Sequence, residues 1–141
     1  MNNKDLMIGD WVNLNFEVDY KTGKSIYAPV QITGINKNGT IDVNCTYDKS
    51  ESMQDGWDLK LIEPIPLTKE ILHKNGFCGE VYLWISAGDE KILEYYPFEH
   101  RLSLWHSEEK NQEILFKCHC FYAHELQHAL TMCGIEKEIV L

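Results

Sequence analysis

The sequence lacks the features that mark several functional classes. No apolar run approaches the roughly 18 residues of a membrane-spanning helix, and the amino terminus has no long apolar stretch typical of a secretion signal. Paired C-x-x-C motifs, a glycine-rich phosphate loop and a G-x-S-x-G nucleophile elbow are also missing. We therefore expect a cytoplasmic protein with no redox pair, no P-loop and no serine-hydrolase triad.

Positive charge is scarce. The chain has 13 Lys and Arg residues against 22 Asp and Glu residues, for a net charge of −9, and the basic residues form no cluster. Such a balance repels both a nucleic-acid backbone and an anionic membrane surface. We expect neither as a partner, which leaves an unknown protein partner or self-association.

The composition is that of an ordinary globular domain. Of the 141 residues, 44% are hydrophobic and 25% are charged. A chain of this length buries roughly 68% of its unfolded surface, so it needs neither a metal nor a disulfide to fold. The five cysteines are scattered and are expected to be reduced. We predict one domain, 1–141, with a β-rich part at about 6–66 and a sheet-plus-helix part at about 67–141.

Alternating apolar and polar residues predict strands in the first part. They cover 11–16, 26–35 and 40–47, and an extended segment follows at 57–65. Asn36 to Gly39 provides a hairpin turn, because Asn and Gly tolerate positive φ. Lys49 to Gly56 is polar and is expected to be a surface loop. These segments predict an N-terminal meander or a small barrel-like part.

The second part combines strands with two helices. Thr68 is a helix cap, so a short middle helix is predicted at 69–74, ended by Gly76. Strand patterns follow at 77–86, 91–98, 101–106 and 113–120, and a terminal helix at 121–133 stops at Gly134. The prediction is an α+β fold, mostly antiparallel, with the C-terminal helix packed on the sheet through four buried side chains: Tyr122, Leu126, Leu130 and Cys133.

Three segments resemble a known family. They are Ile8-Gly9-Asp10-Trp11-Val12, Glu63-Pro64-Ile65-Pro66-Leu67-Thr68 with Asn75-Gly76-Phe77, and Tyr122-Ala123-His124-Glu125-Leu126-Gln127-His128. Together they look like a family of short gut-bacterial proteins of the Bacteroides type, found in prophages and other mobile elements, with no assigned activity. The resemblance spans nearly the full chain. It also implies that the terminal motif occurs with Gln or Asn in place of some of its residues.

One motif carries recognisable chemistry. His124-Glu125-Leu126-Gln127-His128 fits H-E-x-x-H, in which two histidines one helical turn apart bind zinc and the glutamate activates a bound water. Catalysis would then need Glu125 as the base, with His124 and His128 as metal ligands. A third ligand is not evident, because only 13 residues follow the motif and the metzincin histidine is absent.

Four upstream side chains are candidates for that third ligand: Cys78, placed as in peptide deformylase, and His100, His106 and His119. Against a zinc site, helical geometry sets His124 and His128 opposite the apolar stripe, toward solvent. Cys118 and Cys120 share one strand face and His119 the other, so this triplet cannot grip one ion.

The aromatic residues of the second part allow another interpretation. They could line a ligand groove, although aromatic side chains on strands are usually core: Trp84, Tyr95, Tyr96, Phe98 and Trp105. With no complete site, the sequence favours a non-catalytic accessory or interaction protein of a mobile element, without a cofactor. The alternative is a minimal zinc-dependent hydrolase, peptidase-like or deformylase-like.

Overall fold

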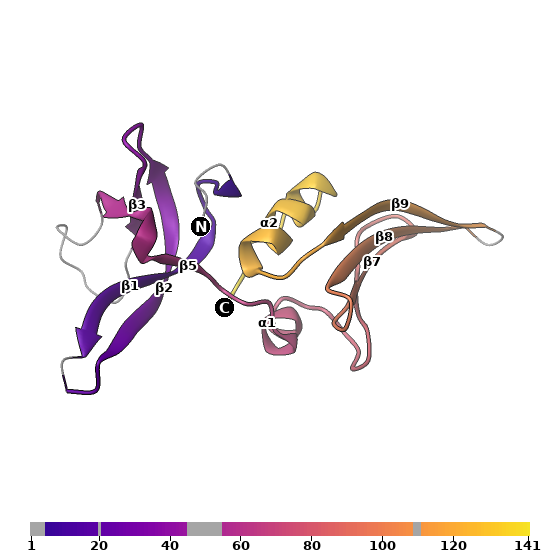
Figure 1. The fold of residues 1–141 in the computed structure, drawn as a ribbon. Coiled ribbons are helices and arrows are strands. Elements are labelled where there is room, and N and C mark those ends of the chain that lie inside the picture. Colours follow the sequence, from indigo (N-terminus) through magenta and orange to yellow (C-terminus); the bar gives the residue numbers. More distant parts are fainter. Residues whose placement is uncertain (1–4, 20, 45–54, 109–110) are drawn as a thin grey trace. The chain divides into compact units, whose positions relative to one another are not determined.

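The structure is a computed structural model that describes residues 5–19, 21–44, 55–108 and 111–141. The chain divides into two compact units, Met1–Ile65 and Pro66–Leu141, and each is described by itself (Figure 1). Within the described residues, no helix is long and apolar enough to cross a membrane. The predictions for residues 45–47 and for most of the polar loop at 49–56 fall outside this description.

The first unit is one antiparallel sheet. Its strands are β1 (Trp11–Asp19), β2 (Lys24–Ile35), β3 (Thr40–Asn44), β4 (Trp57–Asp58) and β5 (Ile62–Pro64). They lie in the order β4-β3-β2-β1-β5, so the first four form the predicted meander. The segment predicted to be extended from 57 to 65 is interrupted by a 3-10 turn, Leu59–Leu61. The Asp58 side chain caps this turn by accepting a hydrogen bond from Lys60 N–H, at 3.0 Å.

The core of the first unit follows from the strand alternation. Residues at every second position point to the same side of a sheet, and here those positions are Val, Leu or Ile. The core comprises Leu6, Val12, Leu14, Val30, Ile32, Ile41, Val43 and Ile62, with Trp57, Leu59 and Leu61 packed against it. In this unit the apolar residues of the strands therefore face one buried side of the sheet.

The second unit holds both helices and a second sheet. Its elements are α1 (Lys69–Lys74), β6 (Leu83–Ser86), β7 (Lys91–Tyr96), β8 (Arg101–Glu108), β9 (Asn111–His119) and α2 (Ala123–Met132). The strands pair antiparallel in the order β6-β7-β8-β9. The predicted α+β class is thus confirmed: two antiparallel sheets, a short middle helix and a C-terminal helix.

The strand predicted from 77 to 86 is wrong in its first half. Gly79 has φ of +106°, and the chain turns back there, so that only Leu83–Ser86 pairs as a strand. Cys78 and Trp84 close the turn through two backbone hydrogen bonds, of 2.8 and 2.9 Å. A Cβ on Gly79 would lie 2.3 Å from the carbonyl oxygen of Tyr82. Only glycine therefore fits this turn, which sets the start of β6.

The end of α1 anchors the C-terminal segment. Thr68 caps the helix as predicted, its Oγ1 accepting from Ile71 N–H at 3.2 Å. Asn75, at the other end, is buried. Its Nδ2 donates to the carbonyls of Ile71 and Val140, both at 2.7 Å, and its Oδ1 accepts from Val140 N–H at 2.8 Å. Ile139 is buried beside this link, which the sequence did not indicate.

The burial predicted for α2 is correct for two of four residues. Leu126 and Leu130 are fully buried, while Tyr122 is 37% exposed and Cys133 is half-buried. The reason is that both outliers lie at helix ends. Tyr122 is the N-cap, with extended φ and ψ of −131° and 155°, so helical spacing does not set its direction. Ala123 and Ala129 are buried with the two leucines instead.

Candidate binding site

Glu125, the candidate base of the H-E-x-x-H motif, has a structural role at the start of α2. Its Oε1 accepts hydrogen bonds from the backbone N–H groups of Phe121, at 3.0 Å, and Tyr122, at 3.1 Å. A carboxylate at this position satisfies N–H groups that a helix start leaves unpaired, and its charge complements the helix dipole. The glutamate therefore points back to the beginning of α2, as the acidic half of a capping box.

The two histidines of the motif do not face solvent as predicted. His124 is only 5% exposed and His128 is half-buried. The His124 ring stacks on Tyr122, with centroids 5.9 Å apart, and meets the His128 ring edge-on at 5.7 Å. The prediction failed because successive helical residues point about 100° apart, yet both Ala123 and His124 are buried. The first turn of α2 is therefore buried on more than one side, which a single apolar stripe does not predict.

Two of the four candidate third ligands, His100 and His119, share a ring contact with Phe121, whereas His106 and Cys78 have other neighbours. The His100 Nδ1 lies 3.2 Å from the Tyr95 hydroxyl, and its ring stacks on Phe121 at 4.6 Å. His119 stacks on Phe121 too, at 6.2 Å, whereas His106 lies 3.9 Å from Glu90. Cys78 is exposed, with its Sγ 3.8 Å from the carbonyl of Gly76. Over the described part of the chain, no group of three or more His, Cys, Asp or Glu side chains could hold a metal ion.

The cysteines near α2 are thiols whose pKa is raised by burial. Cys118 and Cys120 have their sulfur atoms 3.7 Å apart, as expected for alternate positions on one side of a strand. Burial raises the pKa of the Cys120 thiol far above its usual value, and burial also raises the pKa of Cys118 and of Cys133. Because the thiolate is the reactive form, these groups are poor nucleophiles at neutral pH.

The aromatic residues of the second sheet separate into two faces. On β7, Leu93 and Tyr95 point to the buried side, while Ile92, Glu94 and Tyr96 point to the outer side. Cross-strand register places Ile92 opposite Trp105 and Glu94 opposite Trp84. Trp84 is 42% exposed. The sequence interpretation of these aromatics as core is therefore wrong for this outer face and right for Tyr95.

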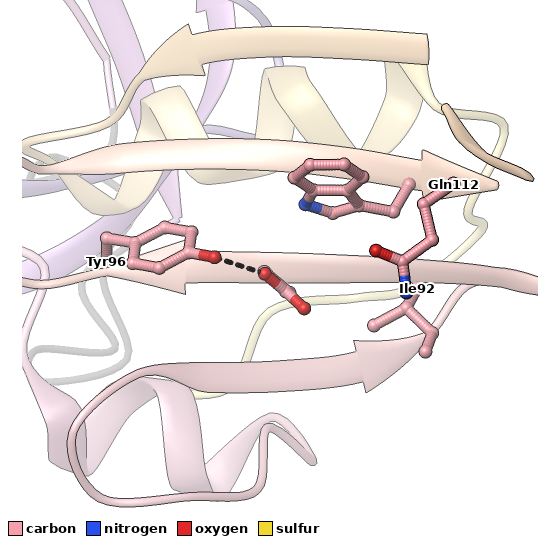
Figure 2. A pocket seen from close by; sticks show the side chains of 5 residues that line it. Ile92, Tyr96 and Gln112 are labelled. Carbon is pink, nitrogen blue, oxygen red and sulfur yellow. Dashed lines mark hydrogen bonds between the residues drawn. The ribbon is translucent and has the colours of Figure 1, made fainter. Parts of the chain in front are cut away.

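A hollow lies on this outer face (Figure 2). It measures about 210 Å³ and is lined by Ile92, Glu94, Tyr96, Trp105 and Gln112. In the picture Tyr96 lies at one end, and Ile92 and Gln112 lie at the other. Three strands contribute: β7 supplies three of the residues, β8 supplies Trp105 and β9 supplies Gln112. Binding sites commonly combine apolar walls with a few convergent polar groups in this way.

Tyr96 is held firmly at its end of the hollow. Its hydroxyl donates to Glu94 Oε2 at 2.5 Å, and this bond raises the pKa of the Tyr96 phenol (Figure 2). The guanidinium of Arg101 lies 4.7 Å from the Tyr96 ring centroid, and the Tyr82 ring stacks on it at 5.8 Å. These contacts fix the position of the Glu94 carboxylate, so the wall is preorganised.

Two donors on the same face lack hydrogen bonds. Trp105 Nε1 and Arg101 Nε are shielded from water and have no partner in the described part of the chain. A buried N–H without a partner costs about 1–3 kcal/mol, and such atoms are rare in native proteins. Because the Trp105 N–H is shielded, the hollow is open to the ring of Trp105 and not to that donor.

The polar members of this site were missed from the sequence. Glu94, Arg101 and Gln112 belong to no motif. A signal was present in the spacing of β7, where apolar or aromatic residues occupy both faces of one strand, at 92 and 96 as well as at 93 and 95. Comparison with protein-family models, with curated proteins and with solved structures found no match to this chain.

Proposed function

We propose that this chain is a non-catalytic binding protein, an accessory or interaction protein of a prophage or other mobile element. It acts through the outer face of the sheet in its second unit. The observation that carries the proposal is the hollow, where the polar side chains of Glu94 and Gln112 lie beside the apolar walls formed by Ile92 and the Trp105 ring. The mobile-element context rests on the family resemblance of the sequence alone.

The polar groups support binding rather than catalysis. The carboxylate at the hollow, Glu94, is bonded to Tyr96 and has no histidine or second acid among the residues that line the hollow. General acid–base chemistry would need such a second group within reach of the substrate. The H-E-x-x-H glutamate, Glu125, is engaged with backbone N–H groups at the start of α2.

The four tryptophans allow a direct test. Trp84 and Trp105 lie on the outer face of the second sheet, while Trp11 and Trp57 belong to the first unit. We would follow all four indole N–H signals by NMR in the full chain while adding saccharides, short peptides and quaternary ammonium compounds. At least one ligand class should shift the first two signals and leave the second two unchanged. Equal shifts of all four, or none with any class, would contradict the proposal.

The zinc-dependent hydrolase is the second candidate, favoured by one contact. The His124 and His128 rings lie 5.7 Å apart on one helix, which suits a shared ion. Metal analysis of protein purified without chelator separates the two candidates. The binding protein should hold far less than one zinc per chain. About one zinc, lost in His128→Ala, together with peptidase activity that Glu125→Gln abolishes, would establish the hydrolase instead.

A further inference from the structure

The hydrogen-bonding groups at the hollow restrict the chemistry of its ligand. The unpaired donors Trp105 Nε1 and Arg101 Nε are shielded from solvent, so the groups left for a ligand are the side chains of Glu94 and Gln112 that line the hollow. Glu94 offers acceptors, and the Gln112 amide offers one of each kind. A ligand that satisfies the whole set must therefore carry acceptors and donors close together.

The charges at and near the hollow exclude anions and cations as its ligand. An anion would meet the Glu94 carboxylate in a chain of net charge −9. A cation could pair with Glu94, but it would lie near the Arg101 guanidinium, which is 4.7 Å from the Tyr96 ring centroid. A hydrocarbon would leave every polar group of the hollow unsatisfied. The ligand is therefore neutral and polar.

The apolar walls require a ligand with a flat, carbon-rich face. Ile92 and Trp105 are direct cross-strand neighbours, and they form the apolar wall of the hollow. Its volume of about 210 Å³ is below the roughly 300–1,000 Å³ of drug-sized sites, so it suits a single ring. The half-exposed Trp84 lies on the next strand, directly across from Glu94, where it can stack on a second ring.

We infer that the outer face of this sheet binds a neutral saccharide, with one pyranose ring in the hollow and a neighbouring ring on Trp84. Sugar hydroxyls both donate and accept, while the C–H faces of the ring are apolar. One hydroxyl donates to Glu94, another bonds to the Gln112 amide, and a C–H face of the ring packs on Trp105. This inference rests on the proposed binding role of the face and specifies its ligand. Peptides instead dock at sheet edges or in elongated grooves, whereas this hollow has room for a single ring.

The test uses the full chain and named probes. Cellotetraose, maltotetraose, xylotetraose and chitotetraose would be titrated by calorimetry and by indole NMR, with hexaproline and acetylcholine as probes of the competing classes. At least one saccharide should bind with a Kd below about 1 mM. Trp105→Ala, which removes this apolar wall, and Trp84→Ala should each weaken binding of that saccharide by at least about tenfold, or about 1.4 kcal/mol.

Phe98→Ala is the matched control, because Phe98 is an aromatic residue of the same unit that is 92% exposed and does not line the hollow. It should leave saccharide binding unchanged. If Trp105→Ala fails to fold, Gln112→Ala at an exposed position replaces it. Saccharide binding that survives Trp84→Ala and Gln112→Ala overturns the inference. If only hexaproline or acetylcholine shifts Trp84 and Trp105, the saccharide is excluded and the binding role stands. If no probe shifts them, both fail.

Discussion

Two aromatic-rich regions of the second unit differ in how they use their polar groups. Around the start of α2, Glu125 bonds to two backbone N–H groups, and the Tyr95 hydroxyl donates to the carbonyl of Cys120 at 2.9 Å. On the outer sheet face, Trp105 Nε1 has no partner in the described residues. The polar groups near the recognisable motif thus bond within the fold, whereas the region without a motif holds a donor that has no partner among the described residues. A motif alone does not locate function.

The largest expected effect comes from the anchoring of α2. Leu126→Ala removes a fully buried side chain, so the free energy of unfolding should fall by about 2–5 kcal/mol, the usual result of opening a core cavity. Met132→Ala is the control on the same helix, since Met132 is exposed. Urea denaturation followed by the indole signals of Trp84 and Trp105 gives both values. Similar small changes for the two variants would mean that α2 is not part of the core.

Tyr95→Phe should be next in size. It leaves the carbonyl of Cys120 without its hydroxyl donor, and a lost buried partner costs about 1–3 kcal/mol. Burial raises the pKa of Tyr95 from 10.0 to about 12. The folded state therefore holds the phenol proton more tightly, so this stabilisation is complete below pH 10 and is lost as the pH rises from 10 to 12.

The difference in stability between wild type and Tyr95→Phe should consequently shrink across that pH range. Urea midpoints measured at several pH values from neutral to strongly alkaline test it. A difference that stays constant with pH would show that the Tyr95 hydroxyl is not held as described.

Glu125→Ala should have a smaller effect, of about 0.5–2 kcal/mol, because it removes the acceptor for two N–H groups at the start of α2. Glu125→Gln retains an oxygen acceptor and should cost less. Glu136→Ala, at an exposed position of the C-terminal segment, serves as the matched control. If Glu125→Ala proved as neutral as Glu136→Ala, the capping role would be wrong and the catalytic interpretation of the motif would regain support.

The smallest effect on stability is expected on the outer sheet face. Gln112 is exposed at the rim of the hollow, so Gln112→Ala should change the free energy of unfolding by less than about 0.5 kcal/mol. The same variant should weaken binding when saccharides are titrated. If Gln112→Ala lowered the free energy of unfolding and kept its saccharide affinity, the outer sheet face would contribute to folding rather than to binding.

Local signals in the sequence located most elements. Thr68 and Gly76 bracket α1 as predicted, because capping depends on a few adjacent residues. Alternation found the strands of both sheets, although it missed the turn at Gly79. In the first unit one face of each strand is apolar and the core is clear. On β7 both faces are apolar or aromatic, so alternation could not tell the outer side from the inner one.

The candidate site depended on contacts that are distant in sequence. The hollow joins Ile92 with Trp105 and Gln112, which meet only when three strands pair. The burial of His124 was missed because helical periodicity describes one buried face and cannot foresee an enclosed first turn. Asn75 and Val140 are likewise 65 residues apart. Local patterns carry no information on such pairings.

The turn at Gly79 restricts which amino-acid substitutions this part of the chain can accept. The backbone oxygen of Tyr82 leaves no room for a Cβ there, and the two bonds between Cys78 and Trp84 keep the turn closed. Glu80 and Val81, between these fixed points, are exposed. In a saturation library under selection, position 79 should tolerate only glycine, while positions 80 and 81 accept most residues. Side chains beside Trp84 can therefore be exchanged while the backbone of the turn stays the same.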